Sequence, residues 1–140
     1  MAKQKKTKPC YCDSGLPLSQ CCQPLLHNEQ QATTAVALMR SRYSAYTLGD
    51  EDYLLRTWHS STRPTQLDLH NNPQNWQRLK IIDTATGQAA DNNGEVEFIA
   101  IYKINGRAER LHERSRFARE DQQWRYIDGI ISNDGMNDSD

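Results

Sequence analysis

The four cysteines of this 140-residue chain all lie between Cys10 and Cys22. They form two pairs, Cys10 with Cys12 and Cys21 with Cys22, and eight residues separate the pairs. Four thiolates are the number that a closed tetrahedral zinc site requires, with Zn–S bonds of about 2.3 Å. A segment this short buries too little apolar surface to fold alone, so a bound metal would supply its folding free energy. The cysteines therefore predict a structural Zn²⁺ site with no coordination position open to a substrate.

Redox-active thiols and an unstructured loop are the alternative interpretations of this segment, and His27 is a further candidate ligand. The lysines at the start of the chain lead into Pro9 and Cys10, whereas a secretory signal would continue into an apolar run. The longest apolar run, residues 98–102, is far shorter than the roughly 20 residues of a membrane span. We expect a cytoplasmic protein with no membrane segment, in a compartment where metal ligation is favoured over disulfides.

Charge is uneven along the chain, although the net charge is only −1. Residues 1–9 carry four lysines and residues 133–140 carry three aspartates, so we expect a flexible basic lead and an acidic disordered tail. The alternative for the lead is a contact surface for an acidic partner. The balanced charge and the lack of an aromatic–basic platform argue against nucleic-acid binding.

Helical periodicity dominates the first half of the chain. Apolar residues recur at three- and four-residue steps after Thr33 and Thr34, either of which can cap a helix that Gly49 ends. A second, shorter helix follows the cap residue Asp50 and should turn its leucines and Trp58 inward. The expected helices cover residues 32–48 and 51–58, and the turn-rich residues 60–75 should contain one helical turn near 65–70.

An alternating pattern replaces the helical one after residue 76. Asn105-Gly106 is the strongest hairpin signal in the chain, and residues 91–94 and 121–122 are further turn candidates. The expected strands cover residues 79–86, 95–104, 107–119 and 123–131. Helices followed by sequential antiparallel strands predict an α+β fold with the helices on one face of a curved sheet.

The cysteine segment resembles the SEC-C motif, a small zinc module at the C-terminus of the translocase ATPase SecA. The usual Cys-Pro-Cys-Gly-Ser is Cys-Tyr-Cys-Asp-Ser here, at residues 10–14, and all four ligand positions are kept. The resemblance implies that Cys10, Cys12, Cys21 and Cys22 hold the zinc. By analogy with SecA it also implies an acidic protein partner similar to the export chaperone SecB.

The rest of the chain is similar to the YchJ family of uncharacterised bacterial proteins. The blocks that carry the similarity are LMRSRYSAY (38–46), TWH (57–59), ERSRF (113–117) and WRYIDG (124–129). The resemblance spans residues 10 to about 131. It implies a cystatin-like or nuclear-transport-factor-two-like cone, a curved sheet wrapped on helices around a pocket. We therefore expect a zinc module over residues 10–26 and the cone over residues 32–132.

Two carboxylates fall on strand faces that apolar neighbours should bury. Glu113 shares a face with Leu111 and Phe117, and Asp128 alternates with Trp124 and Tyr126. A buried carboxylate needs a partner or takes up a proton. The predicted partners are Arg40 and Arg42, which lie on the helix expected to cover the sheet.

These residues allow two interpretations. They tie the helix to the sheet, or they form a polar ligand pocket in which Asp128, Glu113 or His59 acts as acid or base. In the second case Trp58, His59 and Tyr43 line the mouth. The candidate pocket residues are Arg40, Arg42, Tyr43, Tyr46, Trp58, His59, Glu113, Ser115, Trp124, Tyr126 and Asp128. The opposite strand face, with Arg110, His112, Arg114 and Arg116, is either a solvated face or a surface for an anionic partner.

Three candidate functions fit these features of the sequence. The first is a cytoplasmic zinc-binding adaptor, whose cone binds a partner or a small molecule. The second is an enzyme of the ketosteroid-isomerase or dehydratase kind that uses a pocket carboxylate, since such cones host these activities. The third is nucleic-acid binding by the zinc module. Related cones often pair through the open sheet face, so a homodimer is also an expectation.

Overall fold

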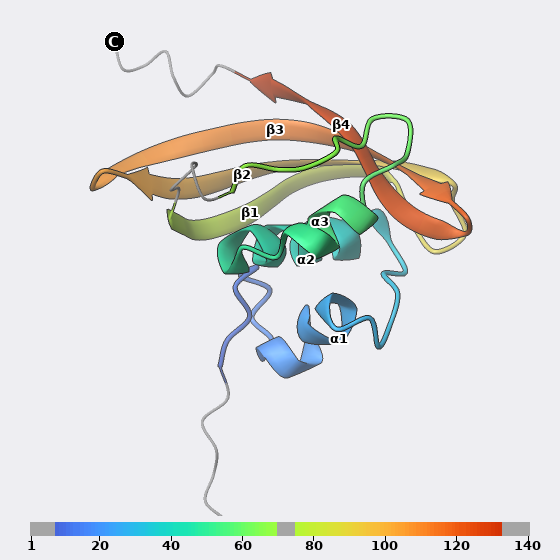
Figure 1. Cartoon of the computed structure of the whole chain (residues 1–140), viewed down its shortest axis with the longest axis horizontal. Coiled ribbons are helices and arrows are strands. Elements are labelled where there is room, and N and C mark those ends of the chain that lie inside the picture. Colours follow the sequence, from blue (N-terminus) through green and yellow to red (C-terminus); the bar gives the residue numbers. More distant parts are fainter. Residues whose placement is uncertain (1–7, 70–74, 133–140) are drawn as a thin grey trace, which may run out of the picture.

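A computed structural model describes residues 8–69 and 75–132 of the chain. These residues form three layers (Figure 1). A curved antiparallel sheet forms one outer layer, and α2 and α3 lie beneath it in the figure. The amino-terminal segment, with its two short helices, lies on the side of α2 away from the sheet. The helices are η1 (Leu18–Gln20), α1 (Gln23–Leu26), α2 (Ala35–Leu48) and α3 (Glu51–Arg56). The α+β prediction is confirmed.

Capping side chains set the helix boundaries. The hydroxyl of Thr34 accepts a hydrogen bond from the backbone of Ala37, and Gly49 ends α2 with φ of 72°. Because Thr34 is extended, α2 starts three residues after the predicted residue 32. Asp50 caps α3 as predicted, but that helix ends at Arg56 rather than at residue 58. Residues 57–59 leave the helix to run beside the last strand.

The sheet is a simple meander in the order β1-β2-β3-β4. Its strands are β1 (Asn75–Thr86), β2 (Asn93–Ile104), β3 (Arg107–Glu120) and β4 (Gln123–Ser132). Positive φ at both Asn105 and Gly106, 53° and 80°, confirms the predicted hairpin turn. Asp121 and Gln122 also adopt positive φ between β3 and β4. The helical turn predicted near 65–70 is absent from residues 65–69, and residue 70 lies outside the described residues.

A β-bulge in β4 changes which face its residues occupy. Tyr126 pairs with Phe117 and Asp128 pairs with Arg116, so Ile127 is an extra residue in β4. The backbone of Tyr126 bonds Thr57 and His59 on its other side, which fixes the strand at this point. The prediction that Asp128 shares a face with Tyr126 is therefore wrong. We call the side of the sheet that faces α2 the inner face and the opposite side the outer face.

One apolar core joins the cysteine segment to the rest of the molecule. Leu38 of α2 is 2% exposed, Phe117 is 1% exposed, and Cys12 and Cys22 belong to the same buried cluster. Burying a side chain as large as Phe117 stabilises the fold by about 1.5–3 kcal/mol. The cysteine segment is thus packed against α2. Most of the expected basic lead and the whole acidic tail lie outside the described residues. Among the helices described, none is both long and apolar enough to cross a membrane.

Candidate metal centre and cavity

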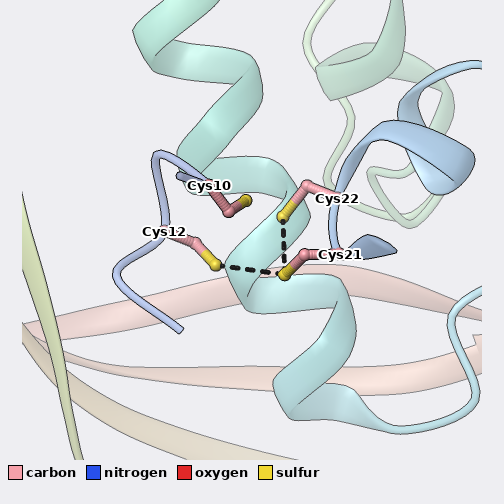
Figure 2. Close-up of side chains that lie close together, drawn as sticks. All are labelled: Cys10, Cys12, Cys21 and Cys22. Atoms are coloured by element: carbon pink, nitrogen blue, oxygen red, sulfur yellow. Dashed lines mark hydrogen bonds between the residues drawn. The ribbon is translucent and has the colours of Figure 1, made fainter. Parts of the chain in front are cut away.

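The four cysteine sulfurs converge from two separate stretches of chain (Figure 2). All four lie within 4.8 Å of one another. The Sγ atoms of Cys12 and Cys21 are 3.5 Å apart, and those of Cys21 and Cys22 are 3.9 Å apart. A tetrahedron with Zn–S bonds of about 2.3 Å has edges of about 3.8 Å. The spacing fits one tetrahedral metal ion and is too long for a disulfide, and the four cysteines are free thiols.

Local turns bring the two cysteine pairs together. The backbone N–H of Cys10 donates to the carbonyl of Leu16, and Pro9 forms a bridge with Pro17. Between them, Asp13 has φ of 63°, a conformation that aspartate tolerates better than most residues. Asp13 stands where the SEC-C pattern usually has glycine, so the backbone shape of the motif is kept. Its carboxylate also accepts from the backbone of Leu79, which ties the loop to β1.

The electrostatics of the cluster favour a bound cation. Burial raises the pKa of the Cys21 thiol to about 11. Hydrogen bonds from the Cys12 and Cys22 thiols lower the pKa of Cys10, and the hydrogen bond to Cys10 is the largest cause that raises the pKa of Cys22. The ionisation of each of these thiols therefore depends on its neighbours. A divalent cation would stabilise several thiolates at once, which is the chemistry expected of this donor set.

Neighbouring polar groups complete the surroundings of the cluster. Arg40 donates through Nη1 to the carbonyl of Cys12 at 2.8 Å and lies 3.8 Å from its sulfur. The hydroxyl of Ser14 lies 3.1 Å from the sulfur of Cys21. Such outer groups orient metal ligands and balance their charge. The prediction that Arg40 pairs with a sheet carboxylate is wrong, because its side chain reaches the cysteine segment instead. His27 is exposed and is not part of the cluster.

A cavity of about 340 Å³ lies between α2 and the inner face of the sheet. Its wall is mostly aromatic and aliphatic, with the charged groups of Arg42 and Glu113 in it. The lining residues are Met39, Arg42, Tyr43, Tyr46, Trp76, Phe98, Ala100, Leu111, Glu113, Ser115 and Tyr126. Six of the predicted pocket residues therefore meet here: Arg42, Tyr43, Tyr46, Glu113, Ser115 and Tyr126.

Neutral hydroxyl groups hold Glu113 in place. Its Oε2 accepts from Ser115 at 2.8 Å and from the hydroxyl of Tyr126 at 3.3 Å. Gly129 lies against the carboxylate, and a Cβ added to Gly129 would be 2.0 Å from Oε2. Only glycine at position 129 leaves room for this arrangement.

Arg42 is the buried cation of the cavity, with 3% of its surface exposed. Its Nη1 donates to the carbonyl of Leu54 at 2.8 Å and to the hydroxyl of Thr57 at 2.7 Å. The guanidinium lies against the rings of Trp58 and Tyr126, which pack on each other, with centroids at 4.9 and 4.6 Å. Burial lowers the pKa of Arg42. In the described part of the chain no carboxylate lies within 4.0 Å of this group, so the predicted ion pair of Arg42 with a sheet carboxylate is wrong.

The other candidate residues lie outside the cavity. Asp128 accepts two hydrogen bonds from Arg116 on the outer face, at 2.7 and 2.9 Å. The ring of His59 bonds the hydroxyl of Ser61. Trp124 is buried, but its indole N–H donates to the carbonyl of Thr33 near the start of α2. Trp58 packs edge-on against Tyr126 behind the cavity wall.

The stripe of basic residues on β3 is matched by acidic residues on the outer face. Arg114 donates to Glu95 at 2.6 Å, to Glu97 at 3.0 Å and to Asp83 at 3.1 Å. His112 lies 2.6 Å from Glu97. This arrangement agrees with the interpretation of a solvated sheet face.

Trp76 is the most informative lining residue that sequence reasoning missed. It is the second residue of β1 and precedes the predicted strand, and its ring contacts those of Tyr43, Tyr46 and Tyr102 with centroid distances of 5.9, 6.2 and 5.1 Å. Trp76 pairs directly with Tyr102, an inner-face residue of β2. This pairing depends on the register of the two strands, which the sequence alone does not give. Phe98 and Ala100 follow from the alternation of β2.

Comparison with known proteins identifies the body of the molecule. Residues 34–129 match the family described as YchJ, middle NTF2-like domain. A UPF0225 protein of Chromobacterium violaceum is 46% identical over 134 residues, which are 94% of this chain and 98% of the relative. A UPF0225 protein of Polaromonas naphthalenivorans is 48% identical over 129 residues, covering 91% of this chain and 88% of the relative.

Two solved structures with the same fold are also similar. RPA3114 from Rhodopseudomonas palustris, a SEC-C motif containing protein, superposes with a TM-score of 0.77 at 32% identity, covering 88% of this chain and 98% of that one. A SEC-C motif containing protein from Psychrobacter arcticus gives 0.71 at 26% identity, covering 91% and 83%. A cysteine cluster able to hold a metal, an NTF2-like body and close relatives over nearly the whole length place this chain in the YchJ (UPF0225) family.

Proposed function

We propose that this protein is a cytoplasmic zinc-binding adaptor that acts by binding and not by catalysis. The convergence of four sulfurs within 4.8 Å carries the proposal, because four thiolates fill a tetrahedral zinc site. No ligand position is left for water or substrate, so the zinc is structural. It fastens the amino-terminal segment to α2, and the cavity of the NTF2-like body receives a small molecule.

Metal analysis of freshly purified protein tests the zinc site. We expect one zinc per chain by native mass spectrometry at neutral pH, which also reports the number of subunits. Cys21→Ser should lose the metal, because three sulfurs remain. Ser14→Ala is the matched control, since it removes the hydroxyl near Cys21 and keeps all four sulfurs. Metal-free protein with an intact amino-terminal fold would overturn the proposal.

The adaptor role requires a surface on the cysteine segment. Leu16 is 48% exposed there, and the ammonium of Lys8 lies 5.0 Å from the ring centroid of Tyr11. An exposed apolar side chain and a basic side chain on the same segment suit an acidic protein such as the SecB chaperone that the SEC-C resemblance implies. Titration with purified SecB should give weaker binding for Leu16→Asp than for Leu48→Asp, a control at a leucine of similar exposure on α2. Equal binding by both variants would contradict this role.

A second candidate function is an isomerase or dehydratase. Glu113 favours it, because a carboxylate in an aromatic cavity is the type of base that such enzymes use. Asp128 and His59 lie outside the cavity and are no longer candidates. Conversion of 3-cyclohexenone to its conjugated isomer, followed by absorbance, would reveal this activity if wild type accelerates it and Glu113→Gln does not. Equal rates with and without protein would exclude it for this probe.

A further inference from the structure

The cavity contains two opposite charges that are not paired with each other. Nη1 of Arg42 donates to neutral oxygens of Leu54 and Thr57, and the guanidinium also interacts with the neutral hydroxyl of Tyr46. The hydrogen bonds of Glu113 all end on Oε2 and come from neutral hydroxyls. Both residues line the same 340 Å³ space. Each charge therefore lacks a direct ion pair within the described chain, and Glu113 acts on Arg42 only at longer range.

An unpaired buried guanidinium has a large desolvation cost. The rings of Trp58 and Tyr126, with centroids 4.9 and 4.6 Å from the guanidinium, offset part of that cost by cation–π attraction. A guanidinium has five N–H donors, and Nη1 supplies two of them. The remaining donors belong to a residue that lines the cavity, where a ligand oxygen or ring nitrogen can accept from them.

The charge balance of the cavity limits which ligands fit. Arg42 and Glu113 sum to zero, so an anion would meet the carboxylate and a cation would meet the guanidinium. A neutral group with an acceptor beside a donor satisfies both at once. Burial raises the pKa of Tyr46 above its ordinary value, so its hydroxyl stays protonated and offers one more donor.

The remaining wall suits a flat ring. Trp76 contacts Tyr43 and Tyr46 on α2 at centroid distances of 5.9 and 6.2 Å, and all three residues line the cavity. Aromatic walls of this kind favour planar ligands through offset stacking and edge contacts.

We infer that the cavity binds a small, neutral, planar molecule with a hydrogen-bond acceptor next to a donor, such as a ring carboxamide or an amino-heterocycle. Arg42 receives the acceptor, Glu113 receives the donor, and the ring packs beside Trp76. This inference rests on the proposed small-molecule function of the cavity and names the class of ligand.

Three probes of equal size and different charge test the inference: benzamide, benzoate and benzamidine. Binding is followed by NMR, through the shift of the Trp76 indole N–H. Benzamide should bind about tenfold more tightly than either ion at neutral pH, because each ion is attracted by one of the two charges, is repelled by the other and must still lose its hydration. In Glu113→Gln the repulsion of benzoate disappears, so its affinity should rise about tenfold and exceed that of benzamidine. Asp128→Asn, on the outer face, is the control and should leave the order of the three probes unchanged.

Tightest binding of benzoate or of benzamidine to wild type would overturn the inference. So would unchanged benzoate affinity in Glu113→Gln, or the absence of a Trp76 shift with all three probes. Metal content and SecB binding are measured on the same preparation. If they are normal while no probe binds, the ligand class and the cavity role fail, and the zinc-dependent adaptor role stands.

Discussion

The inner and outer faces of the sheet both carry arginines and carboxylates, but these groups have different bonding partners on the two faces. On the outer face, Arg114 lies within 3.1 Å of three carboxylates, and Arg116 forms a two-bond pair with Asp128. On the inner face, Arg42 and Glu113 bond only neutral groups among the residues described. The outer charges satisfy one another in solvent, whereas the inner charges are held apart inside a cavity.

The charged groups of the outer face are therefore already paired, whereas those of the inner face can still bind a ligand. Exposed ion pairs contribute little stability, and an incoming anion would have to displace carboxylates already in place. A ligand in the cavity replaces no existing ion pair. The place to look for specific small-molecule binding is therefore the inner face, although the outer face holds more charges.

The largest effect is expected for Gly129→Val. The new side chain would take the place of the Glu113 carboxylate, since even a Cβ would lie 2.0 Å from Oε2. Glu113 would lose its bonds to Ser115 and Tyr126, and the crowded cavity would be strained. We expect a loss of about 2–3 kcal/mol in the free energy of unfolding. Urea denaturation measures this loss.

Ile130→Val is the matched control for that substitution. Ile130 is the next residue of β4, points to the outer face opposite Arg114, and is 72% exposed. The free energy of unfolding of this variant should differ from that of wild type by no more than about 0.5 kcal/mol. Similar losses for the two variants would mean that the inner face is not the more constrained one.

Much of the fold and the cysteine cluster could be predicted from local sequence signals. The four clustered cysteines predicted the metal-binding arrangement, Thr34 and Gly49 predicted the limits of α2 to within three residues, and Asn105-Gly106 predicted a hairpin. Each of these signals acts over a few residues, so no knowledge of the distant chain is needed.

The position of Asp128 could not be predicted in this way. The extra residue Ile127 reverses the alternation of β4, and it lies where the backbone of Tyr126 bonds Thr57 and His59, nearly seventy positions away in the sequence. The two arginines of α2 show the same limit. Arg40 and Arg42 are two positions apart, so a helix turns them to different sides, but only the folded structure tells which one meets the cysteines.

Alkaline pH should weaken the inner face first. Burial raises the pKa of Tyr126 above its ordinary value of 10.0, and burial also raises that of Tyr46. The folded pKa of each hydroxyl exceeds its unfolded pKa. The stability that these protonated hydroxyls contribute is therefore complete below pH 10 and is lost as the pH rises through the folded pKa. The urea midpoint should fall as the pH rises from about 10 to 12, and less so in Tyr126→Phe. A single phenolate transition near pH 10, followed at 295 nm, would contradict this.

Acid should act on the outer face, with a smaller effect. Hydrogen bonds from Arg116 lower the pKa of Asp128 below its ordinary value of 3.8. The contribution of this pair is therefore present above pH 3.8 and is lost as the pH falls through the folded pKa. Between pH 5 and 3 the wild type should lose more stability than Asp128→Asn. If the free energy of unfolding of the two proteins fell equally between pH 5 and 3, the ion pair would not contribute to the pH dependence of stability.

The smallest effect concerns salt and the cluster around Arg114. In wild type, salt screens the attraction between Arg114 and its three carboxylates, so the melting temperature should fall slightly between 0.05 and 1 M NaCl, by about 2 °C or less. In Arg114→Gln the carboxylates of Asp83, Glu95 and Glu97 repel one another, so salt should raise the melting temperature. Glu113→Gln changes the inner face and should keep the wild-type sign, because it leaves Arg114 and its three carboxylates unchanged. A salt response of the same sign in Arg114→Gln and in wild type would mean that these contacts are too exposed to act as a unit, and the contrast between the faces would then rest on the cavity alone.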